Sequence, residues 1–230
     1  MKRNLIEPVL GFCLLGIVIL AVKYGSIHVT GSTDAYIKEM PVVVIDAGHG
    51  GTDPGKVGVD GSLEKDINLA VAKRLKTYLE QDDIRVIMTR ETDTGLYSDT
   101  DSRKKMADMK KRCEIIEESG ADLVVSIHQN SYHEENVFGA QVFYYKTSTE
   151  GEKAAAVIQE ALQEVNPENT KKIKANDTYY LLKKTEVPTV IVECGFLSNY
   201  AEAEKLVSED YQKKLAEAVT KGILQYLKDQ

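Results

Sequence analysis

The sequence predicts a single α/β domain in which helices cover both faces of a mostly parallel, twisted sheet of about six strands. The chain has 230 residues, 43% of them hydrophobic, which is enough for one well-buried domain and too few for two. Apolar runs within 42–46, 122–130 and 189–196 are of the near-continuous kind that is buried on both faces. Amphipathic stretches with helical spacing separate them, and this alternation is typical of a parallel sheet.

An apolar segment precedes this domain. Lys2 and Arg3 are followed by an uncharged run at 9–22, which Lys23 closes. The run has the length of the hydrophobic region of a signal peptide and is short for a membrane span, which needs about 20 apolar residues. We therefore expect an extracytoplasmic domain, secreted or held at the membrane if the segment is not cleaved. The expected division is a signal peptide or membrane anchor at 1–25, a linker at 26–40 and the folded domain at 41–230.

The charge and the cysteines exclude two classes of protein. The net charge is −7, and Lys, Asp and Glu are interspersed rather than grouped in blocks, so nucleic acid is not an expected partner. The three cysteines are too unevenly spaced for a disulfide framework. Cys113 falls on the apolar face of a predicted helix, and Cys194 is expected to be a buried thiol at the end of a strand.

The first strand leads directly into a glycine-rich loop. Residues 42–46 read VVVID, and AGHGG follows them. The stretch 62–81 then has apolar residues at helical spacing, so we predict a helix with Ser62 as its N-cap and Glu64 near its start. The apolar positions of this helix are Ile67, Ala70, Val71, Leu75, Tyr78 and Leu79.

A second strand and a second helix follow. The run IRVIMTR at 84–90 predicts a strand, and the polar residues at 91–102 predict a loop. A helix is expected from Arg103, with Gly120 as its C-terminal stop. Its apolar face is predicted to contain Met106, Met109, Cys113 and Ile116.

The second half of the chain continues this alternation. Residues 122–130 and 189–196 predict buried strands. Asn199 and Glu202 have the spacing of a capping box, so a helix is expected to begin there. The remaining predicted elements are strands at 140–145 and 179–185 and helices at 150–165 and 209–228.

Polar residues stand at the carboxyl ends of three of these strands. His49, His128 and Glu193 each come at the end of an apolar run, and Glu64 heads the helix after the first strand. The carboxyl ends of parallel strands meet at one edge of a sheet, so these four side chains are expected to converge. Two imidazoles and one carboxylate are the ligand set of a catalytic zinc site with a place for water, and the other carboxylate could act as general base and acid. Each residue alone is better explained as a hydrogen-bonded structural residue, whereas four at equivalent positions favour a site.

The glycine-rich loop could instead hold an anion on its backbone N–H groups. The sequence GHGGTDPG at 48–55 has neither the G-x-G-x-x-G pattern nor the lysine of a phosphate-binding loop, and Pro54 lacks an N–H donor. The glycines are better explained by a tight turn that directs His49 back to the sheet edge. Asp46 could orient a ligand histidine or hold the loop, and a turn-capping role is equally consistent with its position.

Four segments together resemble a known enzyme family. IDAGHGGTDPG, LEKD, SIHQN and VECGFLSN are similar, in this order, to the signature segments of the zinc-dependent N-acetylmuramoyl-L-alanine amidases, the amidase_3 family. The resemblance spans 41–227 and implies hydrolysis of the amide between N-acetylmuramic acid and the L-alanine of the peptidoglycan stem peptide. It implies that His49, Glu64 and His128 bind one Zn2+ per chain and that Glu193 is the catalytic glutamate.

The N-terminal segment and the single catalytic domain are most similar to the sporulation and germination-specific type of this family, which implies a role in spore cortex maturation or germination. The family has a polar residue at Asn130 that could contact substrate or a metal ligand, although a turn role explains it as well. Only 131–139 separate this residue from the next strand, so no built-in lid is expected.

No wall-binding module is recognised, so an accessory envelope protein that localises or activates the enzyme is expected. Two alternatives stay open. The chain could be a catalytically weak or partner-dependent envelope protein of the same fold, or another zinc hydrolase of peptidoglycan, such as a deacetylase or a peptidase.

Overall fold

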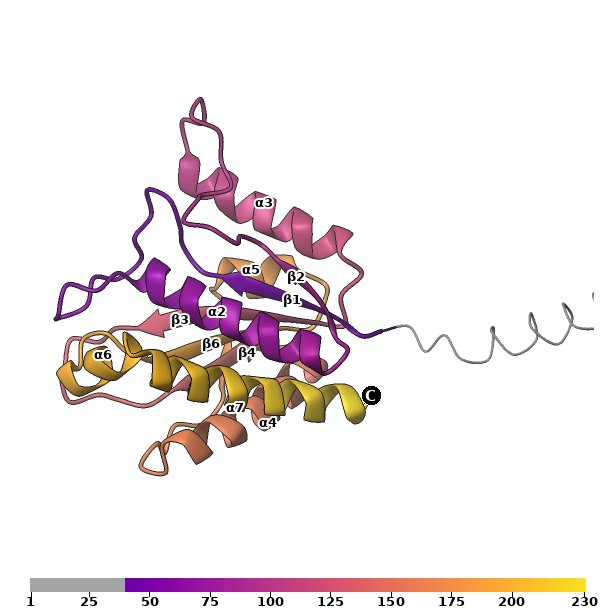
Figure 1. Ribbon diagram of the computed structural model, residues 1–230. Coiled ribbons are helices and arrows are strands. Elements are labelled where there is room, and N and C mark those ends of the chain that lie inside the picture. Colours follow the sequence, from indigo (N-terminus) through magenta and orange to yellow (C-terminus); the bar gives the residue numbers. More distant parts are fainter. Residues whose placement is uncertain (1–39) are drawn as a thin grey trace, which may run out of the picture. The chain divides into compact units, whose positions relative to one another are not determined.

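Six strands form one sheet in the order β2-β1-β3-β6-β4-β5 (Figure 1). All neighbouring pairs are parallel except β4 with β6, so the predicted mostly parallel sheet of about six strands is confirmed. The strands are β1 (Val42–Ala47), β2 (Arg85–Met88), β3 (Leu123–Asn130), β4 (Gln141–Tyr145), β5 (Lys174–Asn176) and β6 (Thr189–Phe196).

This computed structural model describes residues 40–230. The predictions for the segment at 1–25 and for the linker up to residue 39 lie outside the described residues. Residues 41–230 form a unit of their own. Among the described residues, no helix has both the length and the apolar composition needed to cross a bilayer.

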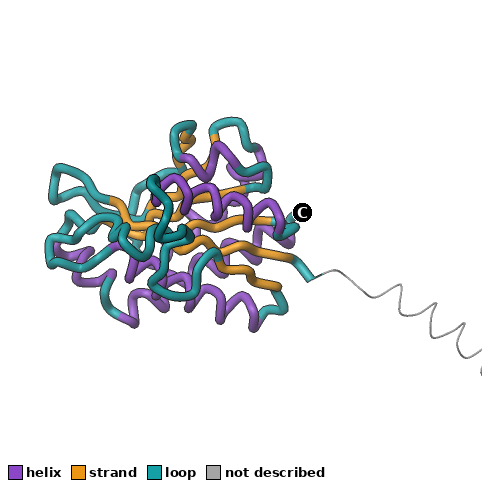
Figure 2. The backbone as a smooth tube through the Cα atoms, turned by 90° about the horizontal axis from the view of Figure 1, so that it is seen from above, coloured by secondary structure: helices purple, strands orange, loops and turns teal. Residues whose placement is uncertain are grey.

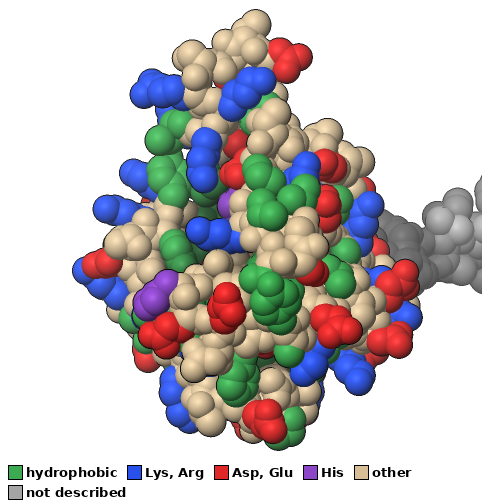
Figure 3. All heavy atoms as spheres, turned by 90° about the vertical axis from the view of Figure 1, so that its left-hand side faces the viewer, with side chains coloured by type: hydrophobic (Ala, Val, Ile, Leu, Met, Phe, Trp, Pro, Cys, Tyr) green, Lys and Arg blue, Asp and Glu red, His purple; other side chains and the backbone are tan. Residues whose placement is uncertain are grey.

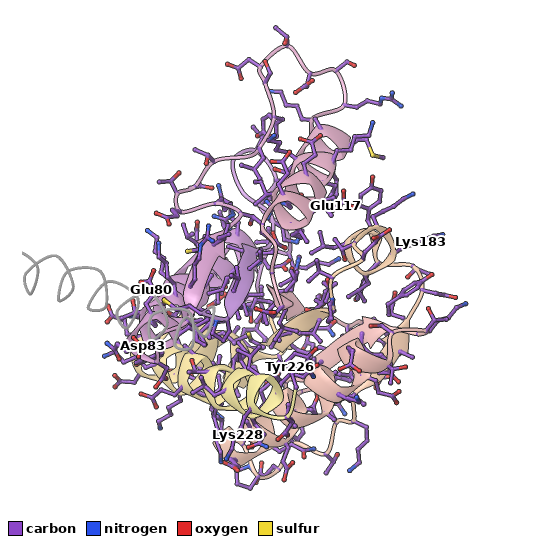
Figure 4. The ribbon with its side chains drawn as sticks, turned by 90° about the vertical axis from the view of Figure 1, so that its right-hand side faces the viewer. Glu80, Asp83, Glu117, Lys183, Tyr226 and Lys228 are labelled. Atoms are coloured by element: carbon purple, nitrogen blue, oxygen red, sulfur yellow. The ribbon has the colours of Figure 1, made fainter. Side chains whose placement is uncertain are left out.

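Helices cover both faces of the sheet, as predicted (Figures 1 and 2). One face packs against α2 (Glu64–Gln81), α4 (Thr149–Val165) and α7 (Glu209–Lys228), and the other against α3 (Lys104–Glu118) and α5 (Tyr180–Lys184). The short helix α6 (Tyr200–Leu206) follows β6. In Figure 4, Glu117 of α3 and Lys183 of α5 lie on one side of the sheet, and Tyr226 and Lys228 of α7 lie on the other.

The first face carries the larger hydrophobic core. In α2 the predicted helical spacing places four side chains in this core, and they are at most 3% exposed: Ile67, Val71, Leu75 and Leu79. Burying each such side chain contributes about 1.5–3 kcal/mol relative to leaving it in water. The packing of this face therefore holds α2, and with it the residue at its start, Glu64, at a fixed place beside β1 and β3.

The structure corrects the prediction for 179–185. This stretch forms helix α5 rather than a strand, because the Asn176 side chain accepts hydrogen bonds from the N–H groups of Thr178 and Tyr179 at 2.8 Å each and turns the chain there. The edge position in the sheet belongs to β5, whose sequence KAN has no apolar pattern that would have revealed it.

Two other predictions concerned helix ends and faces. Ser62 does not cap α2, because its hydroxyl donates to Asp60 at 2.6 Å and Leu63 occupies the cap position without a side-chain hydrogen bond. Met106 is 43% exposed and not part of the apolar face of α3. Gly120, with φ of +63°, ends α3 as predicted.

One of the two hydrogen bonds of the capping box predicted at α6 is present. Asn199 accepts a hydrogen bond from the Glu202 N–H at 3.0 Å, as the pattern predicts. The Glu202 carboxylate does not return to Asn199; it accepts from the N–H groups of Gly139 and Phe196 instead. The two cysteine predictions fit the structure, since Cys194 is buried and Cys113 packs against the core beneath α3.

Candidate metal centre

The site lies at the carboxyl edge of three adjacent strands, β1, β3 and β6. His49 follows β1 by two residues, and His128 of β3 pairs in register with Glu193 of β6. Figure 3 faces this edge of the molecule, where a small patch of histidine surface shows between hydrophobic and basic side chains. The sheet order therefore brings together residues that are 144 positions apart in the sequence.

Both imidazoles face one oxygen of Glu64, the first residue of α2. Glu64 Oε1 lies 3.2 Å from His49 Nε2 and 2.9 Å from His128 Nδ1. The two rings meet edge to face, with their centroids 5.1 Å apart. One ligand atom from each of the three residues lies within 4.8 Å of the others. The structure thus brings three of the four residues together on a scale that suits a single metal ion, and the fourth, Glu193, lines the same cavity as the two histidines.

The donor set fits zinc. A tetrahedral Zn2+ binds imidazole nitrogen and carboxylate oxygen at about 2.0–2.2 Å, which places ligand atoms roughly 3.3 Å from one another. The two contacts of Glu64 Oε1 are close to this spacing. His49 Nδ1 lies 3.0 Å from Asp53 Oδ2, so its second nitrogen has the carboxylate partner that metal-binding histidines usually have.

The electrostatics of the three residues favour a cation between them. Burial alone would raise the pKa of Glu64, but hydrogen bonds and charge from His128 and His49 outweigh burial and hold the pKa well below its usual value. Burial would lower the pKa of His128, yet the Glu64 carboxylate raises it. The carboxylate that favours a proton on this imidazole would equally favour a metal cation in its place.

Glu193 has the environment of a proton-transfer group. Glu193 is 7% exposed, and its Oε2 has no hydrogen-bond partner among residues 40–230. Burial, together with the negative charge of Glu64, raises its pKa from 4.5 to about 7, against the opposing effect of the two histidines. A carboxyl group with a pKa near neutrality can both accept and donate a proton under physiological conditions.

The candidate metal centre opens into a cavity of about 130 Å³. His49, His128 and Glu193 line it. Apolar and aromatic side chains also line it, from α3, β6, α5 and the residue just before α5: Met109, Ile191, Tyr180, Leu181 and Tyr179. Burial and the charge of Glu193 raise the pKa of Tyr179 to about 12, so its phenol remains protonated beside the carboxylate.

Asp46 and Asn130 are placed differently from the four main residues. Asp46 contacts neither histidine; it is buried and accepts hydrogen bonds from Thr89, Arg112 and Ser126. Burial acts to raise its pKa, but Arg112 and Ser126 lower it to about 2. Asn130 accepts from the N–H of the next residue at 2.8 Å and does not line the cavity, an arrangement that suits a turn role.

Three residues of the site were not identified from the sequence. Asp53 could have been found, since it follows His49 by four residues in the same glycine-rich loop. Arg112 interrupts the apolar face of α3, and a charged residue at such a position was a usable signal. Tyr179 could not have been found, because 179–185 was predicted to be a strand.

Comparisons with known proteins identify the family of this chain. The model of the Amidase_3 family, N-acetylmuramoyl-L-alanine amidase, matches residues 43–225. The germination-specific N-acetylmuramoyl-L-alanine amidase of Bacillus subtilis is 42% identical over 188 residues, covering 80% of this chain and 79% of that protein. The structure of the CwlD amidase from Clostridioides difficile, in complex with the GerS lipoprotein, has a TM-score of 0.80 at 41% identity and covers 83% of this chain and 100% of that one. The catalytic domain of CwlV, an N-acetylmuramoyl-L-alanine amidase from Bacillus (Paenibacillus) polymyxa, has a TM-score of 0.73 at 31% identity, covering 83% and 100%.

Proposed function

The chain belongs to the N-acetylmuramoyl-L-alanine amidase family, and on this premise we propose that it is a zinc-dependent enzyme that hydrolyses the amide between N-acetylmuramic acid and the L-alanine of the peptidoglycan stem peptide. One observation carries the proposal. The ligand atoms of His49, Glu64 and His128 lie within 4.8 Å of one another and line or adjoin the cavity that contains Glu193. The 42% identity to a germination-specific amidase supports a role in the spore cortex during maturation or germination.

The residues of the site have two roles in hydrolysis, metal binding and proton transfer. His49, Glu64 and His128 would hold the metal ion, with Asp53 fixing the orientation of the His49 ring. A bound zinc ion supplies Lewis acidity, which polarises the scissile carbonyl and makes water more acidic. Glu193 accepts a proton from the attacking water as the new C–O bond forms, and it donates that proton to the L-alanine nitrogen as the C–N bond breaks.

The test combines metal content with product analysis. The purified chain is expected to bind one zinc ion and to release, from insoluble peptidoglycan, peptides that begin with a free L-alanine amino group while the glycan strands stay intact. Glu193→Gln is expected to keep the metal and lose about 100- to 10,000-fold of the rate, the usual contribution of a general base. Glu160→Gln, on an exposed position of α4, is the matched control and should release peptides at the wild-type rate.

Other products would contradict the proposal. Release of acetate would indicate a deacetylase, and peptides lacking L-alanine at their amino end would indicate a peptidase that cuts within the stem. A Glu193→Gln variant as active as the wild type would exclude the assigned role of Glu193.

We also propose an extracytoplasmic location and an accessory envelope protein. The solved CwlD amidase, 41% identical to this chain, was determined in complex with the GerS lipoprotein, which supports a partner of that kind here. The segment at 1–25 is expected to be a signal peptide or a membrane anchor, and either would place the domain outside the cytoplasm. If the purified chain alone binds zinc at full occupancy and releases peptides, a partner is not required for metal binding.

A further inference from the structure

Two buried arginines hold the carbonyl groups of the loop that carries His49. Arg112 donates from Nη2 to the His49 carbonyl at 2.6 Å and from Nη1 to the Ala47 carbonyl at 2.8 Å. Arg90 donates to the Ala47 carbonyl at 2.8 Å and to the Gly48 carbonyl at 3.0 Å. The last carbonyl group of β1 and the two that follow it therefore accept hydrogen bonds from guanidinium groups, and of the two arginines only Arg112 reaches the carbonyl of His49 itself.

His49 needs such support because its backbone is in an unfavourable conformation. Its φ is +62°, in the left-handed region that residues with a Cβ atom rarely adopt. In this conformation the imidazole lies beside Glu64 while the carbonyl group accepts the hydrogen bond from Arg112. A strong hydrogen bond to that carbonyl favours this conformation over the more common ones, in which Nε2 would leave Glu64.

Arg112 is itself held rigidly. Its side chain is 2% exposed, Nε donates to Asp108 at 2.6 Å, and Nη1 donates to Asp46 at 2.6 Å. Asp46 belongs to β1 and Asp108 to α3, so the guanidinium group is fixed to both the sheet and the helix that covers it. The position of the His49 carbonyl is therefore set by α3, an element that supplies none of the expected metal ligands.

We propose that Arg112 is a positioning residue of the metal centre, which keeps His49 in the left-handed conformation that places its Nε2 beside Glu64. The proposal rests on the proposed function, because it requires His49 to bind the metal. It predicts that the shape of the guanidinium group matters as well as its charge. A lysine at this position has a single ammonium group and cannot reproduce the planar fork that contacts Asp46, Ala47 and His49 together.

The test measures zinc affinity in the full chain, purified in a mild detergent because of its apolar run at 9–22. Competition with a chromophoric chelator gives the dissociation constant, and the absorption spectrum of the Co2+-substituted protein reports the geometry of the ligands. Arg112→Lys is expected to weaken zinc binding 10- to 100-fold, the usual effect of losing a group that orients a metal ligand, and to change the Co2+ spectrum. Ile116→Ala, one turn further along α3 and also buried, is the matched control. It should lower the melting temperature of the metal-free protein and leave zinc affinity within twofold of wild type.

The outcomes separate this inference from the proposed function. Equal zinc affinity in wild type and Arg112→Lys would overturn the positioning role and leave the metal centre intact, as would an equal loss of affinity in Ile116→Ala. A wild-type chain that binds no zinc would overturn the metal centre and this inference with it. If Arg112→Lys does not fold, the zinc affinity of Asp108→Asn tests the inference instead. This variant removes the negative charge that holds Arg112 Nε and keeps the shape of the Asp108 side chain. An unchanged affinity in Asp108→Asn would then refute the inference.

Discussion

Replacing Glu193 by glutamine should make the unfolding free energy of the metal-free protein less dependent on pH. In the folded chain, burial and the charge of Glu64 raise the pKa of Glu193 from 4.5 to about 7, so the fold favours the protonated carboxyl group. The stability that depends on this proton is fully present below pH 4.5. It is lost as the pH rises from 4.5 to 7, because the unfolded chain ionises first. Glutamine cannot ionise, so the variant should not show this loss.

The expected size follows from the two pKa values. Linkage between a pKa of 4.5 in the unfolded chain and about 7 in the folded chain gives a loss of about 2.5 kcal/mol between pH 5 and pH 8. That is a large part of the 5–15 kcal/mol typical of a folded domain. The charges of His128 and His49 oppose the shift, and both residues are present in the two proteins being compared.

Urea unfolding followed by circular dichroism, at several pH values and with a chelator present, measures this difference. A chelator is needed because a bound metal cation would stabilise the ionised carboxylate and lower its pKa. The difference in unfolding free energy between Glu193→Gln and wild type should change by about 2.5 kcal/mol in favour of the variant from pH 5 to pH 8. The exposed variant Glu160→Gln serves as the control for substitution of a carboxylate. Curves for wild type and Glu193→Gln that run parallel over this range would refute the reasoning.

Three further predictions concern the loop, the sheet edge and the core. Asp53→Ala removes the partner of His49 Nδ1 and should weaken zinc binding 10- to 100-fold in a chelator competition, and unchanged affinity would contradict the orienting role. Gly48→Ala adds a Cβ that would overlap the His128 ring, so we expect the variant to lose zinc. Metal content after gel filtration measures this loss, and a variant with full zinc would show that the ring can move aside. Leu75→Ala, at a fully buried position of α2, should lower the unfolding free energy by about 2–5 kcal/mol in the same urea assay, and a loss below 1 kcal/mol would mean that the core relaxes around the cavity.

The sequence was sufficient for the parts of the fold that depend on local apolar patterns. The runs at 42–46, 122–130 and 189–196 became β1, β3 and β6, and these strands position the candidate site. The pattern failed where another interaction determined the structure. At 179–185 the Asn176 turn and the burial of Leu181 and Leu182 produced a helix from a stretch that reads equally well as a strand.

The interactions that hold the site were harder to predict than its expected metal ligands. His49, Glu64 and His128 could be named because of their positions at the ends of predicted elements. Arg112 and Arg90 act through backbone carbonyl groups, and the sequence does not show where a carbonyl group points. Such partners become visible only when the turn after β1 is known in three dimensions.

The two faces of the sheet explain why chemistry and stability are separated in this fold. Side chains alternate between the faces along a strand, so Val43, Ile45 and Ala47 of β1 enter the large core while Asp46 lies on the face beneath α3 and α5. The register pairs Asp46 with Ser126 and His128 with Glu193, and these polar residues all line the same cavity.

This separation has a consequence for substitutions. The face against α2, α4 and α7 is packed with apolar side chains and supplies most of the buried core. The apolar residues under α3 and α5 form two smaller clusters. Polar groups could therefore occupy the carboxyl ends of β1, β3 and β6 on that side without interrupting the main core. A substitution of a polar residue that lines the cavity should change metal binding or catalysis more than stability, and a substitution of an apolar core residue should do the reverse.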